Sequence, residues 1–435
     1  MKNLQALAMF AILLLVITLS GCQSPINALP PPPGSIAPIK PLTEQMTVNI
    51  YWDATISMQG FTKLAAGNVY RNLPDTLGDI GNLLGEVHFF RFGEQVMPVE
   101  GREYRRFSES GYYTESITSF ASVLDAADPE QLSIVVTDLF ESDADWSNVT
   151  QKLREKYFSK DLSVAIIGIK NSFSGDIFDV GLNAATFSYD SGDDPARFRP
   201  FYLFLMGSEL QLRAFLEQWQ EKGVPAYDIQ YVTFSEYFTS QVTILRVSDA
   251  KNTDKENLLE DNSLSKSDDR LQEVVIPNRK EKVNLRLPGK FQKYPYACDL
   301  KNDKLEKHVK IFTLSDEGQW NEQEGKWQQQ ESKGANISFS LDGNSCELNL
   351  TFQPEGILPQ GQIGLLQVQI VPSRQSVDLP PWISEWDMGN IDIAPEQFDG
   401  SKTVNLKHIA DSLKDSLLTS TQPTIVELDL VVDGR

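Results

Sequence analysis

Histidine and cysteine are scarce in this chain of 435 residues, which contains three of each. Zinc, iron–sulfur and haem sites depend on these side chains, so the sequence offers little material for such centres. Positive charge is also in short supply, because 39 Lys and Arg face 60 Asp and Glu, a formal net charge of −21. Binding to nucleic acid and electrostatic docking on anionic lipid both need basic clusters, so the composition disfavours both.

Catalytic motifs are missing as well. The chain has no Gly-x-Ser-x-Gly, no His-Glu-x-x-His, no phosphate-binding loop and no Cys-x-x-Cys. His88 falls within a strand pattern, and neither His308 nor His408 is accompanied by a nucleophile motif. We expect all three histidines to be structural or at the surface. Carboxylates are plentiful, which keeps a glycosidase-type pair open.

The longest apolar run is Ala6 to Leu19, which is shorter than the roughly 20 residues of a membrane-spanning helix. It follows Lys2 and suits the apolar region of a secretory signal. The next residues complete Leu19-Ser20-Gly21-Cys22, which resembles the lipobox of bacterial lipoproteins. The resemblance implies a signal peptide over residues 1–21, cleavage before Cys22, and lipid on the Cys22 sulfur. The alternative is an uncleaved anchor with an incidental cysteine.

A lipid anchor would place the protein outside the cytoplasm, on the cell membrane or the outer membrane. Residues 22–46 then form the lipidated cysteine and a linker, in which Pro30 to Pro33 are consecutive. Such a run favours an extended polyproline II spacer. We expect this segment to lift the folded part of the chain away from the membrane.

Residues 47–247 alternate between apolar strand patterns and helical patterns. Strands are expected at 48–52, 87–92, 132–137, 162–169, 201–206 and 228–234, and helices at 61–84, 117–127, 145–158 and 209–221. Several of these strands are apolar throughout, which is typical of strands buried on both faces. The pattern predicts an α/β domain of Rossmann-like type with a largely parallel sheet.

Polar side chains follow the first and third of these strands, where open α/β sheets bind ligands. Asp53-Ala54-Thr55-Ile56-Ser57 ends one strand, Asp138 ends the other, and Thr118 opens the helix between them. Together these segments resemble the metal-ion-dependent adhesion site of von Willebrand factor type A domains. The resemblance implies a cation held by Asp53, Thr55, Ser57, Thr118 and Asp138.

The match has two departures and one rival. Thr55 stands where the family usually has serine, and Ser116-Ile117 stand where it often has two glycines. Thr114 is a rival to Thr118 for the threonine ligand. The donor set itself contains two carboxylates and three hydroxyls, which are the oxygen ligands that Mg²⁺ prefers. Mg²⁺ is therefore the expected cofactor, with Mn²⁺ or Ca²⁺ as alternatives, and a carboxylate of a partner protein is the expected ligand.

Two further acidic groups are interpreted as surface features. Glu141, Asp143 and Asp145 follow the proposed site; we interpret them as a solvated loop before a helix, and a second cation site is the alternative. Asp190, Asp193 and Asp194 lack the spacing of a calcium-binding loop and read as a surface turn.

The second half of the chain changes character. Residues 248–272 are polar and read as a linker. Residues 273–435 contain short strand patterns, including a hairpin through Asp342-Gly343-Asn344-Ser345, and predict a β-rich, sandwich-like domain. One late helix is expected, with an apolar face formed by Leu406, Ile409, Ala410, Leu413 and Leu417. Trp382 and Trp386 are expected either in an exposed binding patch or in the core.

Cys298 and Cys346 both lie in this second domain and both fall at inward positions of their strands. Two cysteines in an exported protein favour a disulfide between them, and two separate buried thiols are the alternative.

The function predicted from the sequence is that of a membrane-anchored extracytoplasmic lipoprotein that binds a protein partner through a divalent cation. The alternative is an extracytoplasmic metal-dependent hydrolase. A histidine or an unpaired Glu beside the cation site would favour the enzyme.

Overall fold

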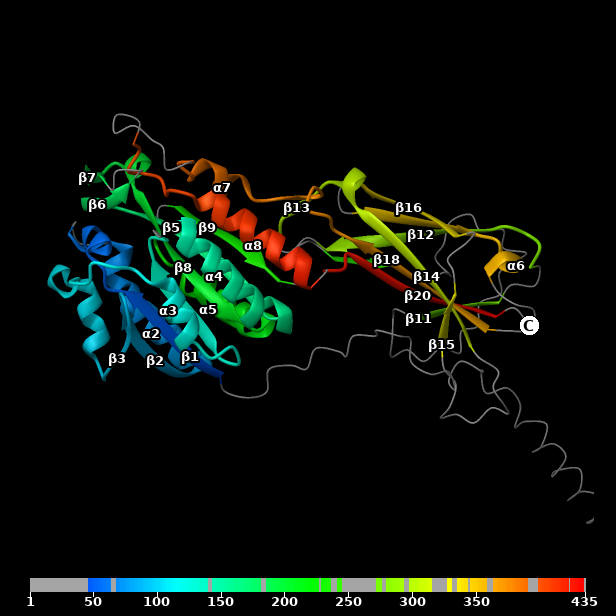
Figure 1. Ribbon diagram of the computed structural model, residues 1–435, viewed down its shortest axis with the longest axis horizontal. Coiled ribbons are helices and arrows are strands. Elements are labelled where there is room, and N and C mark those ends of the chain that lie inside the picture. Colours follow the sequence, from blue (N-terminus) through cyan, green and yellow to red (C-terminus); the bar gives the residue numbers. More distant parts are fainter. Residues whose placement is uncertain are drawn as a thin grey trace, which may run out of the picture.

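The computed structural model describes residues 46–63, 68–139, 143–180, 185–226, 228–235, 241–244, 271–275, 279–292, 297–314, 327–330, 335–342, 345–357, 363–389, 398–421 and 423–433. The expected signal peptide, Cys22 and the Pro-rich segment lie outside these residues, as does most of the expected linker 248–272. Within the described residues, no helix is both long and apolar enough to cross a bilayer. An α/β part and a β-rich part follow one another along the long axis of the molecule (Figure 1).

A seven-stranded sheet forms the centre of the α/β part, in the order β3-β2-β1-β4-β8-β5-β9. Its strands are β1 (Met46–Asp53), β2 (Gly85–Phe92), β3 (Val96–Val99), β4 (Leu132–Thr137), β5 (Ser163–Asn171), β8 (Arg199–Gly207) and β9 (Asp228–Phe234). β1 lies between β2 and β4 and pairs in parallel with both. The helix α2 (Val69–Leu84) makes the crossover between β1 and β2, as parallel pairing requires.

The expectation of a largely parallel sheet holds in part: β1, β2 and β4 pair in parallel and β5 runs in the same direction, whereas β3, β8 and β9 run the opposite way. β8 lies between β4 and β5 and is antiparallel to both, and β9 is antiparallel to β5. The reason lies between β5 and β8, where the chain forms the hairpin of β6 (Ser174–Val180) and β7 (Ala185–Asp190) instead of a crossover helix. Without a crossover the chain turns back, so the central sheet is mixed.

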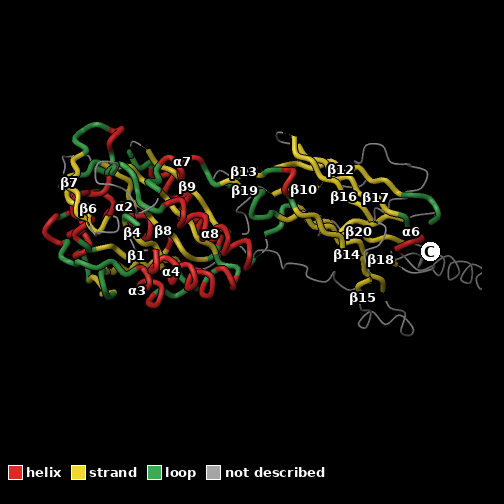
Figure 2. The backbone as a smooth tube through the Cα atoms, turned by 45° about the horizontal axis from the view of Figure 1, so that its top comes forward, coloured by secondary structure: helices red, strands yellow, loops and turns green. Residues whose placement is uncertain are grey.

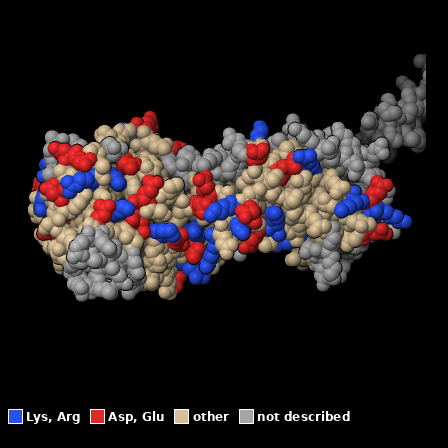
Figure 3. Space-filling model, turned by 90° about the horizontal axis from the view of Figure 1, so that it is seen from above, with Lys and Arg blue, Asp and Glu red and all other residues tan. Residues whose placement is uncertain are grey.

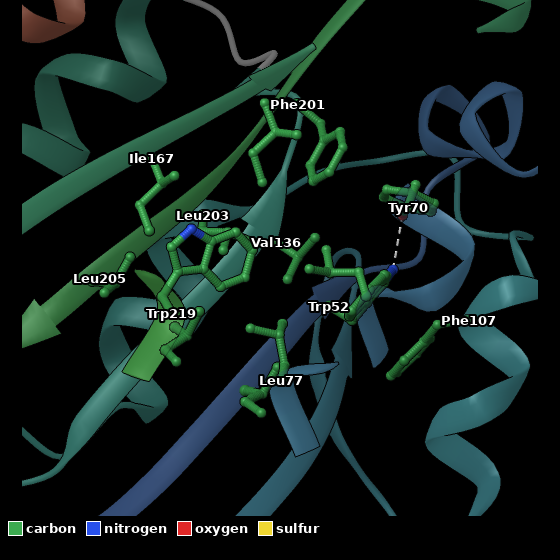
Figure 4. Packing of buried hydrophobic residues seen from close by; sticks show 14 of the residues in the cluster. Trp52, Tyr70, Leu77, Phe107, Val136, Ile167, Phe201, Leu203, Leu205 and Trp219 are labelled. Carbon is green, nitrogen blue, oxygen red and sulfur yellow. Dashed lines mark hydrogen bonds between the residues drawn. The ribbon is translucent and has the colours of Figure 1, made fainter. Parts of the chain in front are cut away.

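Alternate residues of β1 enter two different cores, one on each face of the sheet. Val48, Ile50 and Trp52 pack on the first face against α2 and against α5 (Glu209–Lys222). Figure 4 shows Trp52 and Trp219 in this core, with the indole Nε1 of Trp52 donating a hydrogen bond to the Tyr70 hydroxyl at 2.8 Å. Tyr51 points to the second face. This face is the one that the late helix of the chain covers.

The second face is covered by three helices, two from the α/β part and one from the end of the chain. They are α3 (Phe120–Ala126), α4 (Asp143–Lys156) and α8 (Leu406–Ser420). α8 packs beside α4 and forms one core with it, as Figure 1 also shows. The five apolar residues expected on the inner face of this helix are all buried. The helix forms as predicted, but it covers the α/β sheet and does not interrupt the β-rich core.

The β-rich part is a sandwich of two sheets around a third core, and Figure 2 shows the two layers. One sheet has the order β10-β12-β17-β16 and the other β11-β20-β18-β14-β15. The first sheet contains β10 (Gln241–Ile244), β12 (Val283–Gln292), β16 (Ala335–Asp342) and β17 (Ser345–Phe352). The second contains β11 (Leu271–Val275), β14 (Glu306–Leu314), β15 (Trp327–Gln330), β18 (Ile363–Val371) and β20 (Val426–Asp433). The predicted hairpin is β16–β17, with Asp342 paired to Ser345.

The chain passes between the two parts several times. β10 lies inside the range expected for the first domain, yet it pairs with β12 of the sandwich. In the other direction, β13 (Asp299–Leu300) pairs with β19 (Val377–Asp378), and α7 (Pro381–Glu385) leads on toward α8. Trp382 and Trp386, at α7, are buried on the second face of the α/β sheet. Chain order therefore does not separate the two parts at a single boundary.

The disulfide expected between Cys298 and Cys346 is wrong, because both residues are buried free thiols. Cys298 packs in the core on the second face of the α/β sheet, and Cys346 packs in the sandwich core. The prediction from strand alternation that both side chains face inward is correct, but they face different cores. Burial raises the pKa of both thiols, that of Cys346 to about 11.

Charged side chains of both signs are interspersed over the face shown in Figure 3. Neither sign forms a continuous field on this face. The residues of the predicted site, in contrast, lie at one end of the central strands, with Asp53, Thr55 and Asp138 buried and Ser57 and Thr118 half-buried.

Candidate metal centre

Asp53 is the last residue of β1, and its side chain is fully buried. The chain turns directly after it, because the backbone N–H and the hydroxyl of Thr55 both donate to Asp53 Oδ1, at 3.0 and 2.6 Å. A side chain that accepts from the backbone two residues later is a common way of fixing a tight turn. This turn places the Thr55 hydroxyl beside the Asp53 carboxylate.

Two further hydroxyls join Thr55 at this end of the sheet. The Ser57 Oγ lies 3.1 Å from Thr55 Oγ1, and Thr118 Oγ1 donates to Thr55 Oγ1 at 3.3 Å. The two chain segments are held together by a bridge between Thr55 and Glu115. Thr114 is exposed, and its backbone N–H donates to the Ala54 carbonyl at 3.1 Å. Of the two candidate threonines, Thr118 is therefore the one that the fold brings to Thr55.

Asp138 directly follows β4, the strand that neighbours β1, and is buried. The preceding residue, Thr137, donates its hydroxyl to Asp53 Oδ2 at 3.0 Å, so the ends of β1 and β4 are joined at the site. The next residue, Leu139, has a left-handed backbone with φ of 58°. That conformation is unfavourable for a bulky side chain, but the buried Leu139 is fixed in the core. The strained turn holds Asp138 at the strand end.

The electrostatics of the site are unusual because it contains two buried carboxylates. Burial, with a smaller contribution from the negative charge of Asp138, raises the pKa of Asp53 to about 7. Asp138 also has a cationic partner, since Arg199 Nη2 lies 3.6 Å from Asp138 Oδ2 with both side chains buried. Burial lowers the pKa of the Arg199 guanidinium, and Asp138 opposes that effect.

The residues present fit a small divalent cation in their chemistry. Asp53, Thr55, Ser57 and Thr118 form a chain of contacting oxygen atoms, and oxygen donors are what Mg²⁺ and Mn²⁺ take in proteins. A cation would also compensate the buried negative charge. In the described part of the chain, no three His, Cys, Asp or Glu side chains gather closely enough to hold a metal. The expected site does not fall in this class, because it combines only two carboxylates with three hydroxyl groups.

Two residues of the site were missed by the sequence reasoning. Thr137 precedes Asp138 directly, so a hydroxyl at the strand end was a readable signal. Arg199 begins β8, some 60 residues later in the chain. No motif marks it, and only the insertion of β8 beside β4 brings it to Asp138.

The remaining candidates lie elsewhere. Glu141 lies outside the described residues, and Asp143 and Asp145 fall within α4. Asp190 and Asp194 stabilise turns by accepting from the backbone N–H groups of Gly192 and Ala196. All three histidines are exposed.

A protein that acts as a hydrolase here would need a base beside the cation. Among the described residues, Glu115 is the acidic side chain whose backbone pairs with the site, and it forms an ion pair with Arg91. That ion pair engages the Glu115 carboxylate with a guanidinium.

Comparison of the chain with protein-family models, with curated proteins and with solved structures gives no match. The functional interpretation consequently depends on the geometry of the site and on the sequence motifs.

Proposed function

We propose that this chain is a membrane-anchored extracytoplasmic lipoprotein that binds a protein partner through a divalent cation. The cation ligands are Asp53, Thr55, Ser57, Thr118 and Asp138, as in an adhesion site of the von Willebrand factor A type. The observation that carries the proposal is the convergence of three segments at one end of β1 and β4. Thr118 contacts Thr55 within the first segment, and Thr137, directly before Asp138, donates to Asp53.

The chemistry of the donor set supports binding of a carboxylate. The three hydroxyls are neutral, so only two negative charges compensate the cation. A cation bound in this way offers an electrophilic coordination position to a carboxylate of the partner.

The surface next to the site supports a protein as the partner. Ile56 and Ile117 are 39% and 55% exposed, and they are two of the four exposed large apolar residues in the described part of the chain. Each is directly adjacent in sequence to a proposed ligand. Exposed apolar side chains of this kind supply the apolar core of a protein interface, which is surrounded by a polar rim.

Calorimetric titration with Mn²⁺ and Mg²⁺ tests the site. The wild-type chain is expected to bind, and Asp53→Ala is expected to lose at least tenfold in affinity because a charged ligand is removed. Asp193→Ala is the matched control, since Asp193 is exposed and distant in sequence from the site. Equal affinity of the two variants would place the cation elsewhere.

The partner is identified by capture in the presence of Mn²⁺ and in the presence of EDTA. A protein recovered by wild type and by Asp193→Ala with Mn²⁺, but not with EDTA and not by Asp53→Ala, is the expected result. Recovery that is independent of the cation would contradict a cation-bridged interface.

A further inference from the structure

Arg199 is a buried cationic side chain next to Asp138, one of the proposed cation ligands. It is 2% exposed, and the guanidinium carbon lies 5.5 Å from the ring centre of Phe173. Besides the ion pair with Asp138, Nη1 donates to the carbonyls of Gly400 and Lys402, at 3.2 and 3.1 Å. Nε is buried and has no hydrogen-bond partner. Arg199 thus joins a proposed cation ligand to a segment about 200 residues further along the chain.

That segment, residues 398–403, is here called the strap. Phe398 stacks on Phe187 of β7 with ring centres 4.6 Å apart, and Thr403 Oγ1 lies 2.7 Å from the Tyr202 hydroxyl of β8. The strap precedes α8 and is held on β7 and β8 by these side-chain contacts. Arg199 adds two hydrogen bonds to its backbone.

We infer that Arg199 sets the cation affinity of the site and couples cation binding to the docking of the strap. This inference rests on the function proposed above, because it concerns the same site. A cation held by Asp53 and Asp138 must share Asp138 with a guanidinium only 3.6 Å away from it. Two like charges repel strongly where water is excluded, so Arg199 and the cation compete for Asp138.

Competition has a consequence at the strap. When a cation weakens the ion pair, Arg199 loses one of the contacts that fix its position, and its hold on Gly400 and Lys402 weakens with it. Coupling between two equilibria is reciprocal. Loosening the strap is therefore expected to raise the affinity of the site for the cation, and a bound cation is expected to loosen the strap.

The experiment is Mn²⁺ titration by calorimetry on the full chain, combined with hydrogen exchange of residues 398–403. Arg199→Met removes the competing charge, and we expect it to bind Mn²⁺ at least tenfold more tightly. Arg199→Lys keeps the charge and is the matched control, with affinity expected within threefold of wild type. Saturating Mn²⁺ is expected to accelerate exchange of the strap in the wild type.

A third variant tests reciprocity without changing the charge at the site. Thr403→Val removes the contact with Tyr202, so it loosens the strap and is expected to bind Mn²⁺ more tightly than wild type. If Arg199→Met fails to fold, the wild-type exchange and the Thr403→Val affinity decide the question.

The outcomes separate this inference from the function on which it rests. If the wild type binds Mn²⁺ but the strap keeps its protection, or if Arg199→Met binds no more tightly, the coupling is refuted and the cation site stands. If neither the wild type nor any of the three variants binds Mn²⁺, the proposed function fails and the inference fails with it.

Discussion

The packing of α8 on the α/β sheet leads to a prediction about stability. Leu413 is fully buried between α8 and the sheet, and truncation of such a leucine to alanine costs about 2–5 kcal/mol. Leu413→Ala is therefore expected to destabilise the α/β part of the molecule, although residue 413 lies far beyond the end of its last strand. His408→Ala is the control, because His408 is an exposed residue of the same helix.

The same reasoning gives the consequence of losing the helix altogether. Four large apolar side chains of α8 are buried: Leu406, Ile409, Leu413 and Leu417. At about 1.5–3 kcal/mol each, they contribute roughly 6–12 kcal/mol, as much as the whole stability of a typical domain. A fragment ending at residue 247 is therefore expected not to fold, although it contains every strand of the seven-stranded sheet.

Hydrogen exchange on the full chain is the assay for Leu413→Ala. Protection of β4 and β5 is expected to fall at least 30-fold, the equivalent of about 2 kcal/mol, while β17 in the sandwich keeps its protection. His408→Ala should leave both regions unchanged. Loss of protection in β17 with none in β4 would refute the assignment of α8 to the α/β core, as would a stably folded fragment of residues 46–247.

Three other predictions concern the anchor, the thiols and the buried carboxylate. Cys22→Ser is expected to release the protein from membranes or to leave an unprocessed precursor, measured by detergent-phase partitioning; retention with a correctly cleaved N-terminus would reveal another anchor. Cys298 and Cys346 are expected to react with a thiol reagent only after unfolding, and a disulfide found by mass spectrometry would contradict the separate cores. Because the pKa of Asp53 is raised to about 7 from the usual value near 4, the folded protein holds a proton that the unfolded chain releases. In EDTA, the free energy of unfolding should therefore fall by up to about 4 kcal/mol as the pH rises from 4 to 7, and Asp53→Asn should abolish this slope. Urea titrations at several pH values that give parallel curves for both proteins would contradict the raised pKa.

Local patterns in the sequence determined most of the secondary structure. The strand expected at 228–234 is β9, the helix expected at 209–221 is α5, and the predicted hairpin is β16–β17. These elements follow from periodicity and turn chemistry, which act over a few residues. The local pattern also placed the segments around Asp53, Thr118 and Asp138 beside strand ends or a helix start, but the choice of these residues as a ligand set came from the resemblance to an adhesion site.

Tertiary structure decided the features that depend on contacts between distant residues. The direction of β8 was not readable, since an apolar run has the same composition whichever way it points, and the hairpin before it carries no crossover signal. The apolar face of α8 predicted burial but not the sheet that buries it. Cys298 and Cys346 were correctly expected to face inward, but alternation along a strand does not say which core it faces.

The site shows the same division. From the sequence alone, Asp53, Thr55, Ser57 and Asp138 could be placed at the ends of β1 and β4, because each follows an apolar strand directly, but the hydroxyl of Thr137 was missed. Only the tertiary structure brought Arg199 to Asp138, because that contact needs β8 to insert between β4 and β5 and the strap to close over its first residue. An ion pair depends on the distance between two side chains in space, whereas a sequence pattern reports only on residues that are neighbours along the chain.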